Sequence, residues 1–425
     1  MHKDADIKIE QLSKIEGHAD LDIKIRGGEV ADVKLRIDEN KRFFTQAIRG
    51  MSYMQVPQIV SRICGTCSIA HLSCCIEAVE NIVGFKPSEQ TQLLRNLAMY
   101  GLMIRDHAMH LYLFSLPDVF GKDSILDFDE SLHKYVHHAF AVKGAGNNLS
   151  KLIMGRSVHA TLGQVGGFLK VPEREGIKKS VEELKSVRES VIELIEVFAN
   201  WPEKFERKTN FVGIVSKDYN FLEGRIKSTD GLDIPEEKYW EHLDRVVIPY
   251  SQAEGFEFEG NEYLVGALAR INLNKNNLHK DTRKDAAKFL RMFPSENIFH
   301  NNLAQAIEIL HSIDHAIELL ETHKFKEEKK PVIKPKTNEG VGVIEAPRGT
   351  LYYMLSLNAD GTVRFGNLVI PTAQNQIKMQ SDIKYFLPQL LDKPEEEIKS
   401  ELEKLIRAYD PCMSCASHFL KVNWI

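Results

Sequence analysis

The chain has 425 residues, of which 43% are hydrophobic and 27% charged, a composition typical of a soluble globular protein. Its 26 glycines and 15 prolines are too few for a collagen-like or low-complexity disordered chain. The 55 basic and 60 acidic side chains give a net charge of −5, and because no basic cluster stands out, the composition argues against a nucleic-acid partner.

The sequence carries no signal for a membrane span or for export. No run of about 18 apolar residues occurs, the length that a transmembrane helix needs. Residues Met1 to Asp6 lack the apolar stretch of a secretory signal. We therefore predict a cytoplasmic protein without a transmembrane segment.

The chain begins with a β-hairpin pattern, and long helical patterns follow along its length. Apolar and polar residues alternate from Ile7 to Ile37 around the turn Arg26–Glu29, which predicts a hairpin. Ser88 precedes an apolar repeat of three to four residues, which predicts the start of a long helix. By the same periodicity, further helices are predicted over 128–154, 173–201, 281–292, 297–321 and 395–408.

Other regions show different patterns. Residues 210–272 are irregular and β-like, and they predict a cap or insertion over the helices. Residues 324–336 are charged, contain two prolines and have no apolar period, which predicts an exposed connector with solvated charges. Strands are predicted again over 341–370.

We therefore predict an α+β fold with a large central helical bundle and peripheral β-hairpins or small sheets. A single domain over 1–425 is expected, because no internal repeat or long flexible linker divides the chain. Within it we expect an N-terminal β region, a helical core, a β-rich cap, helices, a charged connector, a second β region and a C-terminal helix with a metal motif, at residues 1–45, 46–205, 206–275, 276–322, 323–338, 339–372 and 373–425.

The cysteines predict a metal site. Cys64 and Cys67 form one C-x-x-C pair near the start of the chain, and Cys412 and Cys415 form another near its end. Two such pairs can bind one zinc, iron or nickel ion through four thiolates, which would bring the two chain ends together. Both a structural zinc site and a catalytic metal site are consistent with this spacing.

The residues beside the cysteines favour catalysis. Arg62 and His71 flank the first pair, and Asp410 and His418 flank the second. Charged and titratable groups contribute nothing to a closed structural ion, but a site that handles protons needs them.

Other metal-binding residue types are interpreted as core residues. Cys74 and Cys75 follow the first pair on a predicted helix, where they would pack as small apolar side chains. His107 and His110 lie three residues apart on another predicted helix, and we interpret them as core or supporting residues rather than as metal ligands.

Both cysteine motifs resemble the signature motifs of nickel-iron hydrogenase large subunits, in the cytoplasmic, cofactor-coupled (group 3-like) branch. The related large subunit of respiratory complex I lacks the four cysteines, so their presence argues against that family. The resemblance covers nearly the whole chain through residues 14–18, 62–71, 106–112, 155–159, 265–270, 345–349, 371–375 and 410–418.

The resemblance implies the ligands of a nickel-iron centre. Cys64 and Cys412 would be terminal nickel ligands, and Cys67 and Cys415 would bridge the nickel to an iron that carries one carbonyl and two cyanide ligands. Thr372 would bind a cyanide, and Pro371 and Pro347 would shape the pocket around these ligands.

The resemblance also implies residues that take part in the chemistry. Arg348 would face the open side of the metals, held by the carboxylates of Asp106 and Asp410. Glu16 would be the first proton acceptor beside a terminal cysteine ligand, because burial beside a thiolate can raise the pKa of a carboxyl, and Cys412 is counted among the catalytic residues.

A magnesium or iron ion is implied near the C-terminus, bound by His418 and by the backbone carbonyl of Leu368. Many family members supply a glutamate to this distal ion from an Arg-x-x-Glu motif, but here Thr45 takes its place after Arg42. A threonine is a poor substitute for a carboxylate on a hard cation, and another acid such as Glu39 could replace it.

By this resemblance the chain is the catalytic subunit of a hydrogenase, an enzyme that cleaves or forms dihydrogen heterolytically. Electrons would pass to an iron-sulfur small subunit, because no cysteines remain to bind clusters here, and then to subunits that use flavin, NAD(P), a deazaflavin or a heterodisulfide-type acceptor. A maturation protease would remove the residues after His418. A regulatory hydrogen sensor and a structural four-cysteine zinc protein are the alternatives.

Overall fold

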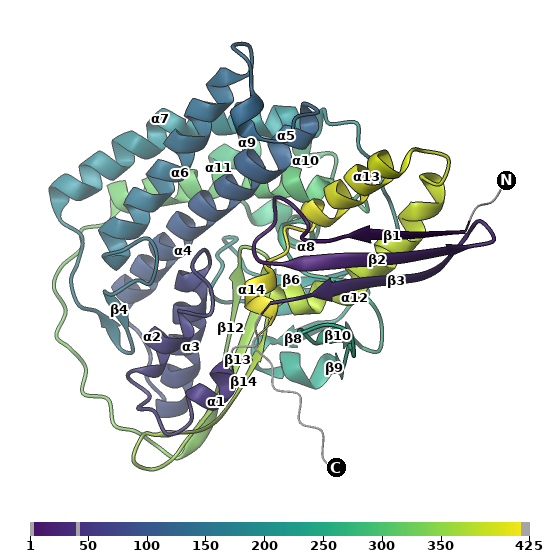
Figure 1. Ribbon diagram of the computed structural model, residues 1–425. Coiled ribbons are helices and arrows are strands. Elements are labelled where there is room, and N and C mark those ends of the chain that lie inside the picture. Colours follow the sequence, from purple (N-terminus) through teal and green to yellow (C-terminus); the bar gives the residue numbers. More distant parts are fainter. Residues whose placement is uncertain (1–3, 40–42, 418–425) are drawn as a thin grey trace, which may run out of the picture.

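Long helices that pack along one another form the central body of the molecule (Figure 1). The structure is a computed structural model that describes residues 4–39 and 43–417. In one of these helices, α11, every residue from Asn301 to Asp314 is buried, including several polar ones. The helices of this body are α4 (Glu89–Met109), α6 (His133–Met154), α7 (Arg174–Ala199) and α11 (His300–Thr322).

Local capping explains where several helices begin. Ser88 caps α4 as predicted, because its side chain accepts a hydrogen bond from the Thr91 amide. The predicted helix over 128–154 begins later, at His133, because the Asp129 side chain accepts hydrogen bonds from Ser131 and forms a turn. The predicted helix over 281–292 is interrupted at Ala286, which separates α9 (Lys280–Asp285) from α10 (Ala287–Leu290).

The N-terminal sheet contains the predicted hairpin and one additional strand. Its antiparallel order is β1 (Ala5–Ile9), β2 (Ala19–Arg26) and β3 (Glu29–Ile37). Gly27 and Gly28 both have positive φ, +59° and +84°, as a tight hairpin turn requires. The sheet packs against α12 (Pro371–Phe386), which leads toward the C-terminus.

A second antiparallel sheet brings distant motifs together. It consists of β12 (Asn338–Ala346), β13 (Gly349–Leu357) and β14 (Val363–Val369). Helix α3 (Ser68–Val83), which directly follows Cys67, lies on β12 and β13. Gly342 permits this contact, since a Cβ atom there would lie 2.2 Å from the Cys74 carbonyl oxygen. The turn between β12 and β13 is thereby held close to the first cysteine motif.

The C-terminal segment returns to the N-terminal sheet. Helix α13 (Glu395–Ala408) matches its predicted bounds, and the short α14 (Met413–Ala416) follows it. A parallel bridge joins Glu16 to Cys412, and the Met413 amide donates to the Glu16 carbonyl at 2.8 Å. Figure 1 shows the yellow α14 beside the purple N-terminal strands, so the two ends of the chain meet as predicted.

The region predicted as β-like contains two small sheets followed by a helix. One sheet has the order β11 (Tyr263–Leu264), β6 (Asn210–Val215), β7 (Arg225–Ser228) and β8 (Asp233–Pro235). The other is the pair β9 (Leu243–Val246) and β10 (Gly255–Phe258). Helix α8 (Ala267–Asn274) packs between β6 and α11. Other short elements are α1 (Phe44–Ala47), α2 (Val56–Val60), β4 (Gly163–Gln164), β5 (Gly167–Phe168), α5 (Leu116–Val119) and the 3₁₀ helix η3 (Glu236–His242).

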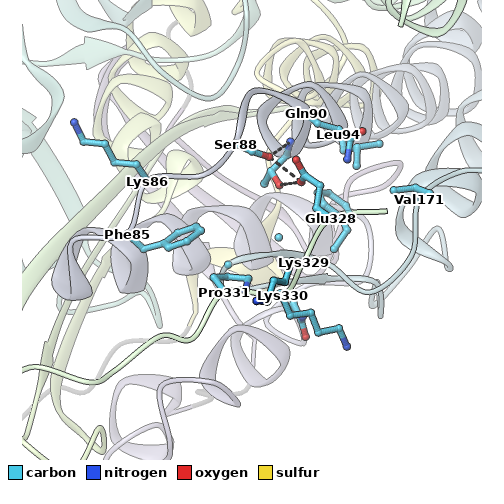
Figure 2. Close-up of a pocket in the computed structure, with 15 residues that line it drawn as sticks. Phe85, Lys86, Ser88, Gln90, Leu94, Val171, Glu328, Lys329, Lys330 and Pro331 are labelled. Atoms are coloured by element: carbon cyan, nitrogen blue, oxygen red, sulfur yellow. Dashed lines mark hydrogen bonds between the residues drawn. The ribbon is translucent and has the colours of Figure 1, made fainter. Parts of the chain in front are cut away.

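The charged connector over 324–336 has no regular structure, but it is attached to the start of α4. Gln90 exchanges two hydrogen bonds of 2.7 Å with the backbone of Lys326. Glu328 accepts from the Ser88 hydroxyl at 2.8 Å, and the connector forms one wall of a surface cavity of about 460 Å³ (Figure 2). The charged side chains of this connector are exposed, as predicted. No helix in the described part of the chain is long and apolar enough to cross a membrane.

Candidate metal centre

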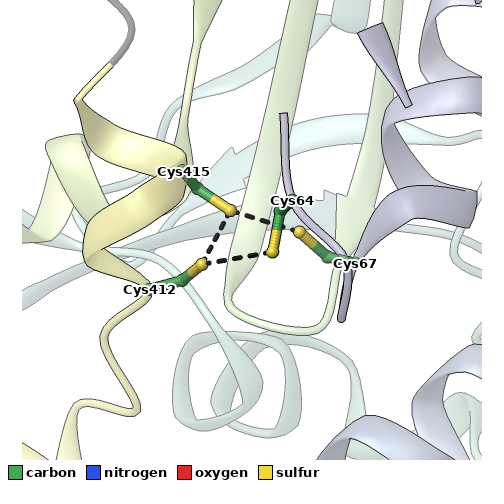
Figure 3. Close-up of side chains that lie close together, drawn as sticks. All are labelled: Cys64, Cys67, Cys412 and Cys415. Carbon is green, nitrogen blue, oxygen red and sulfur yellow. Dashed lines mark hydrogen bonds between the residues drawn. The ribbon is translucent and has the colours of Figure 1, made fainter. Parts of the chain in front are cut away.

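The four cysteines of the two motifs converge on one point (Figure 3). Cys64 and Cys67 lie on the turn that precedes α3, while Cys412 and Cys415 lie at α14. All four are buried, and their Sγ atoms lie within 4.8 Å of one another. This thiol cluster confirms the predicted meeting of the motifs. Within residues 4–39 and 43–417, no other group of three or more Cys, His, Asp or Glu ligand atoms is placed this closely.

The protein alone does not balance the charge that four buried thiolates would carry. Burial raises the pKa of the Cys412 and Cys415 thiols well above their usual range. Hydrogen bonds from the other thiols, first that of Cys412, lower the pKa of Cys64 instead. A bound cation would displace the remaining protons and stabilise all four thiolates.

Arg348 lies at the β12–β13 turn, between two carboxylates. Its Nη1 and Nη2 atoms are each 3.0 Å from a carboxylate oxygen, of Asp106 on α4 and of Asp410 just before the second motif. Burial acts to lower the pKa of Arg348, but these two carboxylates outweigh it and raise that pKa. The guanidinium therefore stays charged in the buried site.

Asp410 is itself held from several sides. Gln305 donates to its Oδ2 at 2.8 Å, and His110 Nδ1 lies 3.1 Å from its Oδ1. Burial acts to raise the pKa of Asp410, but Arg348 and then His110 outweigh it and lower that pKa. The residue has φ of +49°, a strained conformation for a residue other than glycine, which the surrounding contacts maintain.

Glu16 reaches the thiol cluster from the loop between β1 and β2. The Cys412 thiol donates to its Oε2 at 2.8 Å. Burial raises the pKa of the Glu16 carboxyl, and the neighbouring Cys64 adds to this effect. Gly17 follows with φ of +83°, and a Cβ atom there would lie 2.8 Å from the Ser414 amide, so the chain passes close to α14.

An apolar cavity lies on one side of the thiol cluster. It borders Cys67, Cys412 and Cys415, and among its other lining residues are Pro347, Leu351, Ile370, Pro371, Thr372 and the guanidinium-bearing Arg348. The Thr372 hydroxyl oxygen accepts a hydrogen bond of 2.9 Å from the Cys412 amide, which fixes the start of the second motif. The predicted residues Pro347, Pro371 and Thr372 are thus gathered beside the same three thiols.

The comparison with known families gives this site its identity. The family described as nickel-dependent hydrogenase matches residues 42–152 and 235–418. The chain belongs to the nickel-dependent hydrogenase family.

Individual relatives are similar to this chain along nearly its whole length. The chain is 32% identical to sulfhydrogenase 2 subunit alpha of Pyrococcus furiosus, over 98% of this chain and 100% of the relative. It is 27% identical to the NAD-reducing hydrogenase HoxS subunit beta of Cupriavidus necator, with 97% and 94% covered. A solved structure of an NAD⁺-reducing [NiFe]-hydrogenase in the H₂-reduced state has a TM-score of 0.87 at 25% identity, covering 97% of this chain and 99% of that one. The predicted family, fold and enzyme class are confirmed.

This membership makes the thiol cluster the site of a nickel and iron centre, not of a structural zinc ion. The distal ion, by contrast, stays a prediction. Leu368 is buried in β14, but His418 and Arg42 lie outside the described residues. Thr45 lies in α1, and Glu39 accepts a hydrogen bond from the His18 amide at 2.9 Å.

Sequence reasoning missed residues that support the hydrogenase site without belonging to a cysteine motif. Arg105 donates to the Thr66 carbonyl between the first two cysteines at 2.5 Å. Tyr353 forms a hydrogen bond of 2.8 Å with His71. Gln305 donates a hydrogen bond to Asp410, but the sequence around it shows only the apolar periodicity of a helix and no sign of this contact. Of these, only Arg105 adjoins a motif residue that the sequence had singled out.

Proposed function

We propose that this chain is the catalytic subunit of a nickel-iron hydrogenase that cleaves dihydrogen or forms it from protons. The observation that carries the proposal is the convergence of the thiol cluster, the Arg348 guanidinium and the Glu16 carboxyl on one buried site. A structural zinc ion would need the thiolates alone.

The residues present fit the nickel-iron group. The four thiolates would hold the nickel, and Cys67 and Cys415, whose sulfur atoms are 3.3 Å apart, would also bind the iron. One carbonyl and two cyanide ligands on the iron would occupy the apolar cavity between Pro347, Pro371 and Thr372. Within the described residues, the buried Nε of Arg348 has no hydrogen-bond acceptor, which suits a cyanide nitrogen. When bound, this group supplies the centre that polarises dihydrogen and takes up its electrons.

Proton transfer is assigned to Cys412 and Glu16. The Cys412 sulfur would receive the proton released from dihydrogen and pass it to Glu16 Oε2 over the 2.8 Å hydrogen bond. Burial raises the pKa of Glu16, which favours uptake of this proton by the carboxyl before it is passed on. In the direction of dihydrogen formation, the same two groups would deliver the proton.

Arg348 would fix the environment of the open metal face. Its ion pairs with Asp106 and Asp410 keep the guanidinium in one place, so that a positive charge faces the reacting atoms without reorganisation. A lysine would bring a single point charge and lose the planar fork.

Electrons would leave through partner subunits. Cys74 and Cys75 are buried in α3, so the described part of the chain has no further thiol cluster for iron and sulfur. We infer an iron-sulfur small subunit, followed by a flavin, NAD(P), deazaflavin or heterodisulfide-type electron-transfer subunit, in the cytoplasm. NAD reduction by the Cupriavidus necator relative supports an NAD(P)-linked partner. We also infer the distal magnesium or iron ion at His418 and Leu368, and removal of residues 419–425 by a maturation protease.

The test is metal analysis and infrared spectroscopy on the complex purified without oxygen after co-expression with its maturation proteins. We expect nickel and iron in comparable amounts, carbonyl and cyanide stretching bands, and dihydrogen-dependent reduction of a viologen dye. Zinc without those bands would contradict the proposal. The metals and bands with negligible turnover would instead favour a hydrogen sensor.

A further inference from the structure

Arg270 on α8 is the centre of a buried ion cluster behind the metal site. Its side chain is 2% exposed, yet each of the five N–H groups of its guanidinium has an acceptor. Nε and Nη2 donate to the two carboxylate oxygens of Glu308 at 2.6 and 2.7 Å, and Nη1 donates to Glu345 at 2.8 Å. We call Arg270, Glu308 and Glu345 the ion cluster.

The two remaining N–H groups point at the backbone that leads into Arg348. Nη1 donates to the carbonyl of Ala346 and Nη2 to that of Pro347, both at 3.0 Å. These are the two residues immediately before Arg348. One planar guanidinium therefore fixes two consecutive peptide groups, which sets the position from which the Arg348 side chain starts.

The start of α8 touches the same turn. Gly266 has φ of +126°, and a Cβ atom there would lie 3.1 Å from the Arg348 carbonyl oxygen. Gly349 has φ of +133°, and a Cβ atom there would lie 2.5 Å from Val265. Two glycines in conformations that side chains rarely adopt thus allow α8 to pack directly on the turn.

The ion cluster also reaches the helix that carries Asp106. Glu308 Oε2 accepts a hydrogen bond of 2.9 Å from His107, the neighbour of Asp106 on α4. Its Oε1 accepts another of 2.8 Å from the Tyr219 hydroxyl. Burial acts to raise the pKa of Glu308, but Arg270 outweighs it and lowers that pKa to about 2, so the anchor is a carboxylate.

We propose that Arg270, held by Glu308 and Glu345, is a positioning residue for Arg348, and this inference rests on the proposed hydrogenase function. The ion cluster fixes the backbone before Arg348 and the helix beside Asp106, so the Arg348 guanidinium stays between its two carboxylates. Apolar residues of similar volume often stabilise a core as well as buried ions do, so stability alone gives no reason for this arrangement. The two carbonyl contacts before Arg348 give a geometric one.

The test compares Arg270→Lys, Arg348→Lys and the double variant in the intact, metal-loaded complex. A lysine keeps the charge but cannot hold two carboxylate oxygens and two carbonyls at once. We expect Arg270→Lys to lower dihydrogen oxidation per nickel about 10- to 100-fold through displacement of Arg348. The carbonyl and cyanide bands should shift in the same direction as in Arg348→Lys. The double variant should be no slower than Arg348→Lys alone, because both changes act through one group.

Arg95→Lys is the matched control. Arg95 is buried and binds both carboxylate oxygens of Glu80 at 2.7 and 2.8 Å, and Glu80 in turn accepts from the Gly166 amide, away from the Arg348 turn. We expect unchanged turnover per nickel and unshifted bands. If Arg270→Lys does not fold, Glu345→Gln takes its place, because it weakens one contact of Arg270 and should give a smaller shift in the same direction.

Unchanged turnover per nickel in the folded variants would overturn the inference. A loss of turnover with unshifted carbonyl and cyanide bands would also overturn it. So would a double variant that is slower than Arg348→Lys because the two losses of turnover add. A wild-type complex without nickel, bands and turnover would instead contradict the proposed function, and the two failures are therefore distinguishable.

Discussion

The thiol cluster and the ion cluster are both buried near Arg348, but their charges are balanced differently. In the ion cluster every N–H group of Arg270 has an acceptor supplied by the chain itself. In the thiol cluster four sulfur atoms face one another, and the adjacent Arg348 is already paired with two carboxylates.

This difference indicates that the ion cluster is a structural network and that the thiol cluster is a binding site. A fully compensated buried network is complete without a ligand, and it resists change in its geometry. The thiol cluster is completed by a cation, because burial favours protons on Cys412 and Cys415 that a bound cation would displace. Variants in the ion cluster should therefore lower stability and, through Arg348, turnover per nickel while the metals stay bound. Loss of a thiol should remove the metals themselves.

The largest effect is expected for Cys67→Ser. A serine hydroxyl is not a soft anionic ligand, so we expect loss of bound nickel and iron. Dihydrogen oxidation should fall about 1,000-fold or more, because the metal supplies the Lewis acid. Metal analysis, viologen reduction and circular dichroism measure this, with helix content unchanged. Cys75→Ser, at a buried cysteine of α3 outside the thiol cluster, should retain both metals. Equal metal content in the two variants would refute the assignment of the metals to the thiol cluster.

In the ion cluster, Glu308→Gln should lower stability, in addition to any loss of turnover that follows from the displacement of Arg270. It removes the carboxylate that holds Arg270 and leaves a buried guanidinium with less counter-charge, at a cost of about 3–5 kcal/mol. Chemical denaturation of the wild type and the variant measures this difference. Glu321→Gln is the control on the same helix, because Glu321 pairs with Lys185 at the surface and should cost about 1 kcal/mol or less. Similar costs for both variants would contradict the role assigned to burial.

At the border of the thiol cluster, Glu16→Gln should lower turnover but preserve metal and fold. The amide cannot take the proton from Cys412, so dihydrogen oxidation should fall about 100-fold or more. Nickel content and the infrared bands should remain as in the wild type. Glu10→Gln, at an exposed residue of the same N-terminal segment, should have wild-type turnover. Full activity in Glu16→Gln would show that protons leave by another group.

Much of this site could be predicted from the sequence, because its ligands lie in short, spaced motifs. The pairs around Cys64 and Cys412 indicated the thiol cluster, and the flanking charges favoured catalysis. The strong periodicity of 173–201 and 395–408 likewise predicted α7 and α13 closely. The proposed roles of Glu16, Arg348 and Thr372 came from resemblance, and their geometry agrees with them without testing them.

The ion cluster could not be predicted in the same way. Arg270 and Glu308 lie on different helices, and neither sequence segment shows that one binds the other. The parallel pairing of β11 with β6 also joins segments with no shared pattern. The helix predicted over 281–292 is present as α9 and α10, but its break at Ala286 could not be predicted, because the apolar period continues across this residue. Long-range contacts of this kind depend on packing, which periodicity does not describe.

The smallest effect is expected for Glu236→Gln, away from both clusters. Glu236 lies half-buried at the start of a short 3₁₀ helix and accepts a hydrogen bond of 3.2 Å from the Gly224 amide. Burial raises its pKa from the ordinary 4.5 to about 7. Between these two values the folded protein keeps a proton that the unfolded chain has lost, so Glu236 makes stability fall as pH rises through this window. Below the window the side chain is neutral in both states and has no such effect.

A glutamine keeps the acceptor for Gly224 but cannot ionise, so the variant should escape this loss. We expect equal stability near pH 4.5 and a gain of about 1–2 kcal/mol above pH 7, after the screening of a half-buried group is taken into account. Urea denaturation across this pH range measures the difference. Glu237→Gln, at the exposed neighbour, should show no such pH dependence. A stability difference that is the same at every pH would mean that the shape of the side chain, and not its charge, determines its effect. A gain in stability without any change in turnover per nickel would show that this part of the fold acts independently of the metal centre.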